Sequence, residues 1–132
     1  MITFNKTGTY EFEFETSDGG TTITIIDQNR NLDPIYLPSS EDLAASAAAN
    51  LNLTTSYFTT AAAETATLAA GVAGQVKVFA MYGDVGDMVI TVANPGWGGA
   101  GTITFSAVGQ ACTLMYINAK WFAIGNNGAV FA

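Results

Sequence analysis

Residues 75–82 read QVKVFAMY, and with them begins a series of short apolar, β-branched and aromatic segments that runs to the end of the chain. The segments that follow are MVITV (88–92), TITF (102–105), TLMYI (113–117), KWFAI (120–124) and AVF (129–131), with Gly, Asn and Pro between them. Short segments with this punctuation are typical of antiparallel strands in a sandwich or barrel. From about Leu53 onward the pattern predicts roughly eight strands, enough for two packed sheets.

The N-terminal region predicts a β-hairpin. Residues 10–15 read YEFEFE, which places Tyr10, Phe12 and Phe14 on one face of a strand and three glutamates on the other. The turn is expected in SDGG (17–20) and the returning strand in TITII (22–26). The glutamates fit an edge strand that discourages further pairing, or an acidic stripe that faces a basic partner.

One short α-helix is expected in SSEDLAASAAAN, residues 39–50. The serines can cap free N–H groups, the carboxylates favour the positive end of a helix, and Asn50 suits its C-terminal end. The predicted fold is therefore mainly β: an antiparallel, jelly-roll-like β-sandwich over residues 51–132. Residues 1–50 would carry the hairpin and the helix, packed on the main domain or on a neighbouring subunit.

Three loops are predicted to be hairpin turns. GDVGD (83–87) separates two strong strands, and its few carboxylates favour a turn over a calcium site. Asn118 and Ala119 are expected in a tight turn, and GNNG (125–128) in the next one.

Composition points to a chain that associates with something. Of the 132 residues, 49% are hydrophobic and only 11% are charged, against about 25% charged in average soluble domains. A weakly charged surface protects poorly against association, so we expect self-assembly or a docking partner, with a merely Thr-rich soluble domain as the alternative. The net charge of −7 and the lack of a basic cluster argue against nucleic acid and against anionic membranes as partners.

Catalytic chemistry has little support in the sequence. Histidine is absent, and Cys112, the single cysteine, lies between small and apolar residues where a buried, inert thiol is expected. The glycine-rich residues 94–101 lack the features of a phosphate loop. Glu64, Asp84 and Asp87 are only loosely placed carboxylates, which leaves a small hydrolase as a minor hypothesis. We expect no enzyme, no cofactor, no metal and no catalytic residue.

The two tryptophans are expected to differ. Trp121 lies inside a strand segment and is predicted to belong to the core. Trp97 lies in the glycine-rich loop, where it could anchor an interface, stack on a sugar, or fold back to cap the sandwich. The candidate interface residues of this chain are Tyr10, Phe12, Phe14 and Trp97.

Several of these segments resemble a β-module found in structural proteins of tailed phages, especially phages of aquatic bacteria. They are TLAAGVAGQVK (67–77), DMVITV (87–92), GTITF (101–105), YINAKW (116–121) and GNNG (125–128). The resemblance implies a capsid decoration (cement) protein or a part of a fibre. Because the chain has no repetitive shaft or coiled coil, decoration is favoured. It further implies a homotrimer that binds the major capsid protein and stabilises the head against the pressure of packaged DNA.

The expected location follows from the same interpretation. Residues 1–6 lack the apolar core and cleavage site of a signal peptide. We therefore expect a virion protein on the capsid surface, assembled in the host cytoplasm. The alternative is a phage fibre or a receptor- or carbohydrate-binding module, motivated by Trp97 and the many asparagines.

Overall fold

The computed structural model describes residues 10–14, 21–25 and 40–132, and the chain divides into two compact units, Met1–Tyr36 and Leu37–Ala132. In the first unit β1 (Tyr10–Phe14) pairs antiparallel with β2 (Thr21–Ile25), so that Tyr10 lies opposite Ile25. The two arms of the predicted hairpin are thereby confirmed. The predicted turn at residues 17–20 lies outside the described residues.

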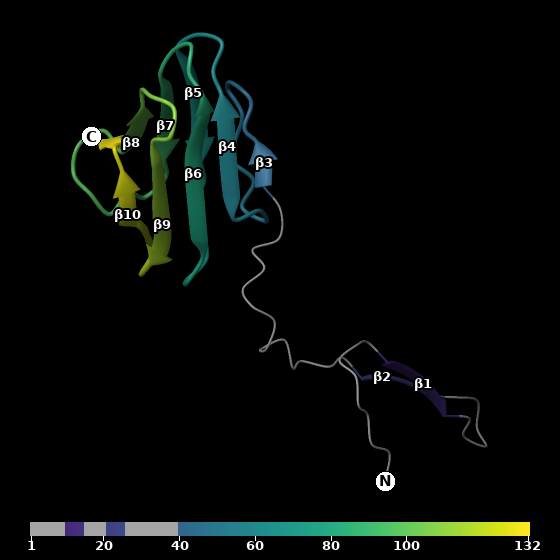
Figure 1. Cartoon of the computed structure of the whole chain (residues 1–132). Coiled ribbons are helices and arrows are strands. Elements are labelled where there is room, and N and C mark those ends of the chain that lie inside the picture. Colours follow the sequence, from purple (N-terminus) through teal and green to yellow (C-terminus); the bar gives the residue numbers. More distant parts are fainter. Residues whose placement is uncertain (1–9, 15–20, 26–39) are drawn as a thin grey trace. The chain divides into compact units, whose positions relative to one another are not determined.

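The second unit consists of two sheets (Figure 1). The five-stranded sheet has the order β10-β9-β6-β4-β3, and the four-stranded sheet has the order β11-β8-β7-β5. The strands are β3 (Ser40–Asp42), β4 (Thr55–Thr59), β5 (Glu64–Leu68), β6 (Val76–Gly83), β7 (Met88–Val92), β8 (Thr102–Phe105), β9 (Ala111–Ile117), β10 (Lys120–Asn127) and β11 (Val130–Phe131). The described residues contain no α-helix, and so none that could cross a membrane. Eight strands lie between Thr55 and Phe131, which confirms the predicted number.

The core lies between the two sheets. Burial alternates along β4, β6, β7, β8 and β9, so every second side chain points inward, as the period-2 pattern predicts. Phe105 of the four-stranded sheet meets Phe58 of the five-stranded sheet edge to face, with ring centroids 5.0 Å apart. Phe79 lies 6.4 Å from the same Phe105 ring. One hydrophobic core therefore holds both sheets together.

The prediction of purely antiparallel sheets is wrong, because both sheets are mixed. β3 with β4, β4 with β6, and β5 with β7 run parallel. The cause is the path of the chain, which passes from one sheet to the other between β4 and β5, β5 and β6, and β6 and β7. A chain that crosses to the other sheet and returns reverses its direction twice. β6 therefore runs parallel to β4, and β7 runs parallel to β5. Strand patterns in a sequence do not reveal which sheet a strand joins.

The predicted turns have different outcomes. Asn118 and Ala119 form the tight turn of the β9–β10 hairpin, and both have positive φ (47° and 63°), as a type I′ turn requires. Residues 83–87 are not a hairpin turn, because β6 and β7 belong to different sheets. Toward the end of the chain the prediction of a hairpin turn at 125–128 is wrong, because β10 continues to Asn127 through an irregularity between Ala123 and Gly125, and β11 joins the other sheet.

The predicted helix at residues 39–50 is wrong. Ser40–Asp42 forms β3, and the backbone N–H groups beyond it bond to other strands: Leu43 N–H to the Tyr57 oxygen (2.8 Å) and Ala49 N–H to the Thr67 oxygen (2.8 Å). Ser46 has a φ of 61°, which a right-handed helix excludes. An isolated helix of this length would have been marginal. Bonding to β4 and β5 therefore replaces it.

The two units divide at a different place from the expected boundary after Asn50. The division falls between Tyr36 and Leu37. Residues 40–50 belong to the second unit because they bond to β4 in one sheet and to β5 in the other.

Candidate functional site

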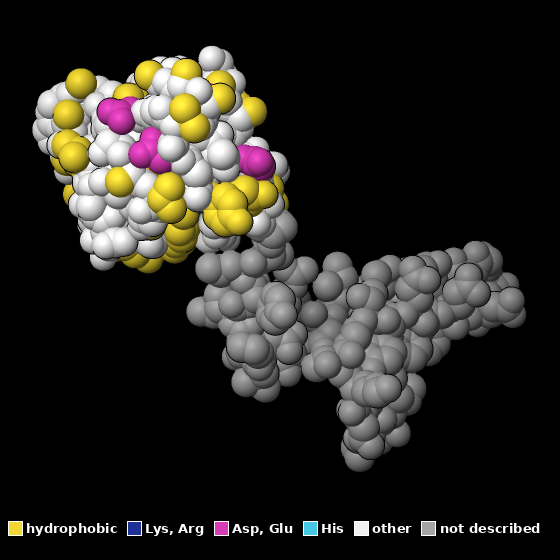
Figure 2. Space-filling view, turned by 45° about the horizontal axis from the view of Figure 1, so that its top comes forward, with side chains coloured by type: hydrophobic (Ala, Val, Ile, Leu, Met, Phe, Trp, Pro, Cys, Tyr) yellow, Lys and Arg dark blue, Asp and Glu magenta, His cyan; other side chains and the backbone are white. Residues whose placement is uncertain are grey.

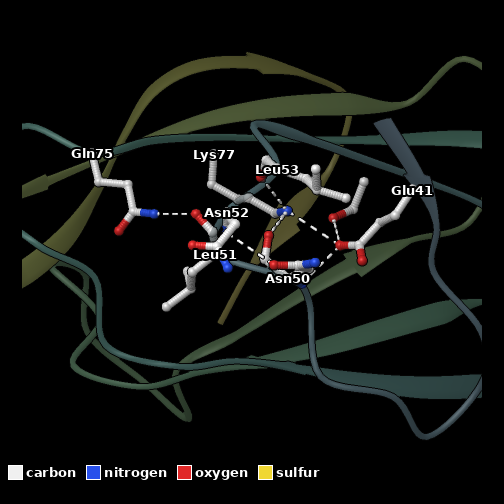
Figure 3. A network of polar contacts seen from close by, with 8 residues as sticks. Glu41, Asn50, Leu51, Asn52, Leu53, Gln75 and Lys77 are labelled. Carbon is white, nitrogen blue, oxygen red and sulfur yellow. Dashed lines mark hydrogen bonds and ion pairs between the residues drawn. The ribbon is translucent and has the colours of Figure 1, made fainter. Parts of the chain in front are cut away.

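The most unusual site in the second unit is a lysine buried in the core. The Lys77 side chain is 0% exposed and points inward from β6, on the same face of the strand as Phe79 and Met81. Its Nζ donates hydrogen bonds to the backbone oxygens of Asn50 and Leu53, both at 2.9 Å, and lies 3.3 Å from Oε1 of Glu41 (Figure 3). The ammonium also lies 5.7 Å from the centre of the Phe79 ring.

Glu41 is the counter-charge at this site. Its Oε1 accepts hydrogen bonds from the Ser56 hydroxyl (2.5 Å) and from the backbone N–H of Asn50 (2.8 Å), in addition to Lys77. Burial alone would raise the pKa of Glu41, but these hydrogen bonds and the Lys77 charge outweigh it and lower the pKa. Glu41 is therefore ionised at neutral pH.

The amine of Lys77 has no capacity left for chemistry. Burial lowers the pKa of Lys77, and the nearby Glu41 partly opposes this effect. All three donor positions of the ammonium have an acceptor within 3.3 Å. A nucleophilic or basic lysine needs a free lone pair that faces a substrate. Lys77 instead ties β6 to β3 and to the loop at residues 50–53.

The surrounding contacts extend this tie. The Gln75 side chain donates to the Leu51 oxygen (2.6 Å) and accepts from the Val72 N–H (3.0 Å), while Asn52 N–H bonds to the Asn50 side chain (2.9 Å). Among the described residues no buried side-chain polar atom lacks a hydrogen-bond partner. The network is thus a saturated structural centre.

Of the predicted interface residues, Trp97 is the one whose side chain is described. It is half-buried, meets Phe131 edge to face at 4.9 Å, and donates from Nε1 to the Ala132 oxygen at 3.3 Å. Of the three options for Trp97, this position matches folding back onto the sheets. Tyr10, Phe12 and Phe14 lie in β1, and their side chains are outside the described part of the chain. These three residues belong to the first unit and Trp97 to the second.

The remaining candidate residues also have defined places. Trp121 is fully buried, as predicted, and donates to the Ala69 oxygen at 2.9 Å. Cys112 is buried as predicted, and burial raises the pKa of its thiol to about 12. The Glu64 side chain accepts from the Ala61 N–H at 2.9 Å, while Asp84 and Asp87 are exposed. The described residues contain no group of three or more His, Cys, Asp or Glu side chains that could hold a metal ion.

The outward face of the five-stranded sheet is largely apolar on β6 and β9. Cross-strand pairing aligns Phe122 with Met115 and Val76, and then Thr113 with Val78. Ala111, Ala80 and Tyr57 form the next row, and Tyr82 contacts Tyr57 with ring centroids 6.1 Å apart. We call this set the outer apolar face: Tyr57, Val76, Val78, Ala80, Tyr82, Ala111, Thr113, Met115 and Phe122. Figure 2 shows hydrophobic side chains gathered along the lower margin of the second unit.

The outward face of the four-stranded sheet is lined by threonines. Thr67 pairs with Thr91, which pairs with Thr102. In the adjacent row Thr65, Val89 and Thr104 follow one another. These side chains are exposed or half-buried, and their β-branched shape suits a strand while the hydroxyl meets water. This sheet therefore has the usual apolar interior and polar exterior.

Sequence reasoning missed both the buried lysine and the outer apolar face. The signal was present in QVKVFAMY, because Lys77 has the same parity as Phe79 and Met81 while Val76, Val78 and Ala80 share the other face. Only the pairing of β6 with β4 and β9 shows which set of alternate side chains on β6 points into the core.

No family model matches the chain, and no curated protein matches it.

Proposed function

We propose that this chain is a structural protein of a virion, a β-sandwich module that decorates the head of a tailed phage. In this role copies of the chain would join as a homotrimer and bind the major capsid protein on the capsid surface, after assembly in the host cytoplasm. No chemical reaction is involved. The homotrimer and the capsid partner come from the sequence resemblance, and the structure adds an independent reason to expect assembly.

The outer apolar face is the observation that carries the proposal. The largest contiguous apolar patch on a soluble monomer is typically about 300–600 Å² and often has a binding function. Here three aligned rows of mostly uncharged side chains cross the sheet. One row holds Phe122, Met115 and Val76, and the middle row holds Thr113, Val78 and Thr55. The third row holds Ala111, Ala80 and Tyr57, and it ends at Asp42 in β3. A protein that works within an assembly can bury such a face against its neighbours.

The described side chains also give catalysis little support. Lys77 has a full set of acceptors, Cys112 is buried with a raised pKa, and Glu64 is engaged with the backbone of Ala61. A mechanical role agrees with this chemistry. Binding only the mature capsid lattice would stabilise that lattice by mass action.

The alternative, a fibre or a receptor- or carbohydrate-binding module, has less support. A sugar platform needs an open aromatic face, and Trp97 already packs against Phe131 and donates its N–H to Ala132. A glycan array with the full chain and with Trp97→Ala tests this alternative: binding that is lost in Trp97→Ala would favour it.

Phage heads provide the direct test of decoration. Purified full chain is incubated with mature, DNA-filled heads and with unexpanded shells of a phage that encodes it, and bound protein is counted after sedimentation. Decoration predicts saturable binding to mature heads at a fixed number of copies per capsid subunit, and higher resistance of the heads to heat. Absence of binding to both particles would overturn the proposal.

A further inference from the structure

We infer that the outer apolar face is the surface through which copies of this chain associate with one another. The inference deepens the proposed function, because it assigns the face that joins the copies. It concerns association of the isolated chain, so it can be tested without a capsid.

The first argument is that β6 is apolar on its outward face as well as around Phe79 and Met81 on its inward face. This strand directs a lysine into the core and directs Val76, Val78 and Ala80 outward. A sheet with one face in water normally alternates apolar inside and polar outside. The four-stranded sheet follows that rule with Thr67, Thr91 and Thr102 outward. The contrast within one domain indicates that only the five-stranded sheet has a second face meant to be covered.

The second argument is charge, which favours a second copy as the occupant. The residues of this sheet that carry charge outward are Asp42 in β3 and Lys120 at the start of β10, both exposed. The two charges have opposite sign. They also lie at opposite corners of the sheet: Lys120 pairs with Ile117 at one end of β9, and Asp42 lies in the row of Tyr57, Ala80 and Ala111 at the other end. The face as a whole is neutral although the chain carries −7. Two identical faces can therefore meet without like-charge repulsion.

The third argument is size. The rows from Lys120 to Asp42 span about 20 Å along the strands, and the five strands span about 19 Å across, from standard strand rise and spacing. The flat area is roughly 400 Å², about half of the ~800 Å² that each partner buries in a standard interface. Exposed apolar residues at the rim, Ile117 (45% exposed) and Ile124 (53% exposed), can supply part of the remainder.

The fourth argument is that the sheet edges are less suited to pairing. β3 has three residues and β11 has two. The outer edge of β5 bonds to residues 46–49, and β10 is covered at Trp121, whose N–H and oxygen bond to Asn94 and Gly96. Short or covered edges prevent strand addition. Among the described strands, these edges therefore favour association through a face of a sheet over strand addition.

The test compares matched lysine substitutions on the two outward faces of the full chain. Met115→Lys and Val78→Lys place a charge in the middle of the outer apolar face, and Thr104→Lys places one in a half-buried position on the four-stranded sheet. Each changes the net charge by the same amount. Sedimentation equilibrium over a wide concentration range gives the dissociation constant of self-association, and circular dichroism confirms that each variant is folded.

We expect the wild-type chain and Thr104→Lys to self-associate equally, and Met115→Lys and Val78→Lys to raise the dissociation constant by at least about thirtyfold, as a charge in the centre of an apolar interface does. A dimer would correct the number of copies in the proposed function, and a trimer would agree with it. A wild-type chain that stays monomeric at every concentration overturns the inference, and the outer apolar face then belongs to another partner, such as a capsid subunit. Equal weakening by Thr104→Lys also overturns it. Capsid binding by a monomer would leave the proposed decoration role standing while this inference fails.

Discussion

The two sheets of the second unit share one largely apolar core but differ in their outward faces and in the one charged side chain, Lys77, that the five-stranded sheet buries. The four-stranded sheet keeps Ile90 and Ile103 inside and shows threonines to the solvent. The five-stranded sheet keeps Lys77 inside and shows valines, a methionine and aromatic residues to the outside. Side-chain polarity alone therefore does not tell which face of a strand is interior.

The difference shows that a buried charge needs a full set of hydrogen-bond partners, and that an outward apolar face needs a surface that covers it. Lys77 is tolerated inside because Glu41 and two backbone oxygens satisfy its ammonium. Met115 and Val78 have no comparable reason, within one copy, to point outward. Four substitution experiments test the comparison, from the largest expected effect to the smallest.

The largest effect is expected inside the five-stranded sheet, from Lys77→Ala. Removing the ammonium leaves Glu41 without its counter-charge and leaves the Asn50 and Leu53 oxygens without their donor. Breaking a buried ion pair in this way costs about 3–5 kcal/mol. The free energy of unfolding, from urea denaturation, measures it. Lys120→Ala is the matched control, because Lys120 is exposed and should change stability by less than about 0.5 kcal/mol.

Alkaline pH tests the same interior through Cys112. Burial raises the pKa of this thiol to about 12, above its ordinary value of 9.0, so the folded state favours the neutral thiol. Its contribution to stability is complete below pH 9 and is lost as the pH rises toward 12, by up to about 1.4 kcal/mol per pH unit. Cys112→Ala should unfold with a shallower pH dependence above pH 9. Identical slopes for both proteins would show that this thiol ionises as readily in the folded chain as in the unfolded one.

An intermediate effect is expected at the border of the four-stranded sheet, from Trp97→Ala. The change removes the edge-to-face contact with Phe131 and the hydrogen bond to Ala132. Loss of the aromatic pair and of part of the buried ring should cost about 1–2 kcal/mol. Trp97→Phe keeps the ring contact and should recover most of the loss in a thermal melt followed by circular dichroism. No loss in Trp97→Ala would mean that the ring does not pack on β11 in solution.

The smallest effect is expected from exchanging the character of the two outward faces. Val78→Thr and Thr104→Val each keep a β-branched side chain at a half-buried strand position, so each should change the stability of the monomer by less than about 1 kcal/mol. Retention on a hydrophobic-interaction column should fall for Val78→Thr and rise for Thr104→Val. If Val78→Thr costs much more, Val78 is already part of an interior within one copy.

Much of the secondary structure could be predicted from the sequence, because strands have a local signal. The hairpin arms in the first unit, the strand number after Thr55, the turn at Asn118 and Ala119, and the burial of Trp121 and Cys112 all follow from alternation or turn chemistry. The incorrect helix also had a local signal, in serines, carboxylates and alanines. Hydrogen bonds to distant β4 and β5 overrode it.

The sheet topology and the buried centre could not be predicted, because both depend on contacts between distant residues. Glu41 and Lys77 are 36 positions apart, and nothing near either residue identifies the other. Likewise, the pattern of residues 88–92 is the same whether β7 continues the sheet of β6 or begins another. Only the packing of the whole unit distinguishes these cases.

The alternation of the chain between the two sheets has a consequence for folding. Since β4, β5, β6 and β7 belong to the two sheets in turn, neither sheet is made from a continuous segment of the chain. Pairing β4 with β6 or β5 with β7 closes a loop that contains a strand of the opposite layer. Such long-range pairing slows folding to the range of milliseconds to seconds. Newly made chains would thus expose unpaired strands for longer than a sandwich built from consecutive hairpins. An assembly of several copies would therefore form only after this slow folding step.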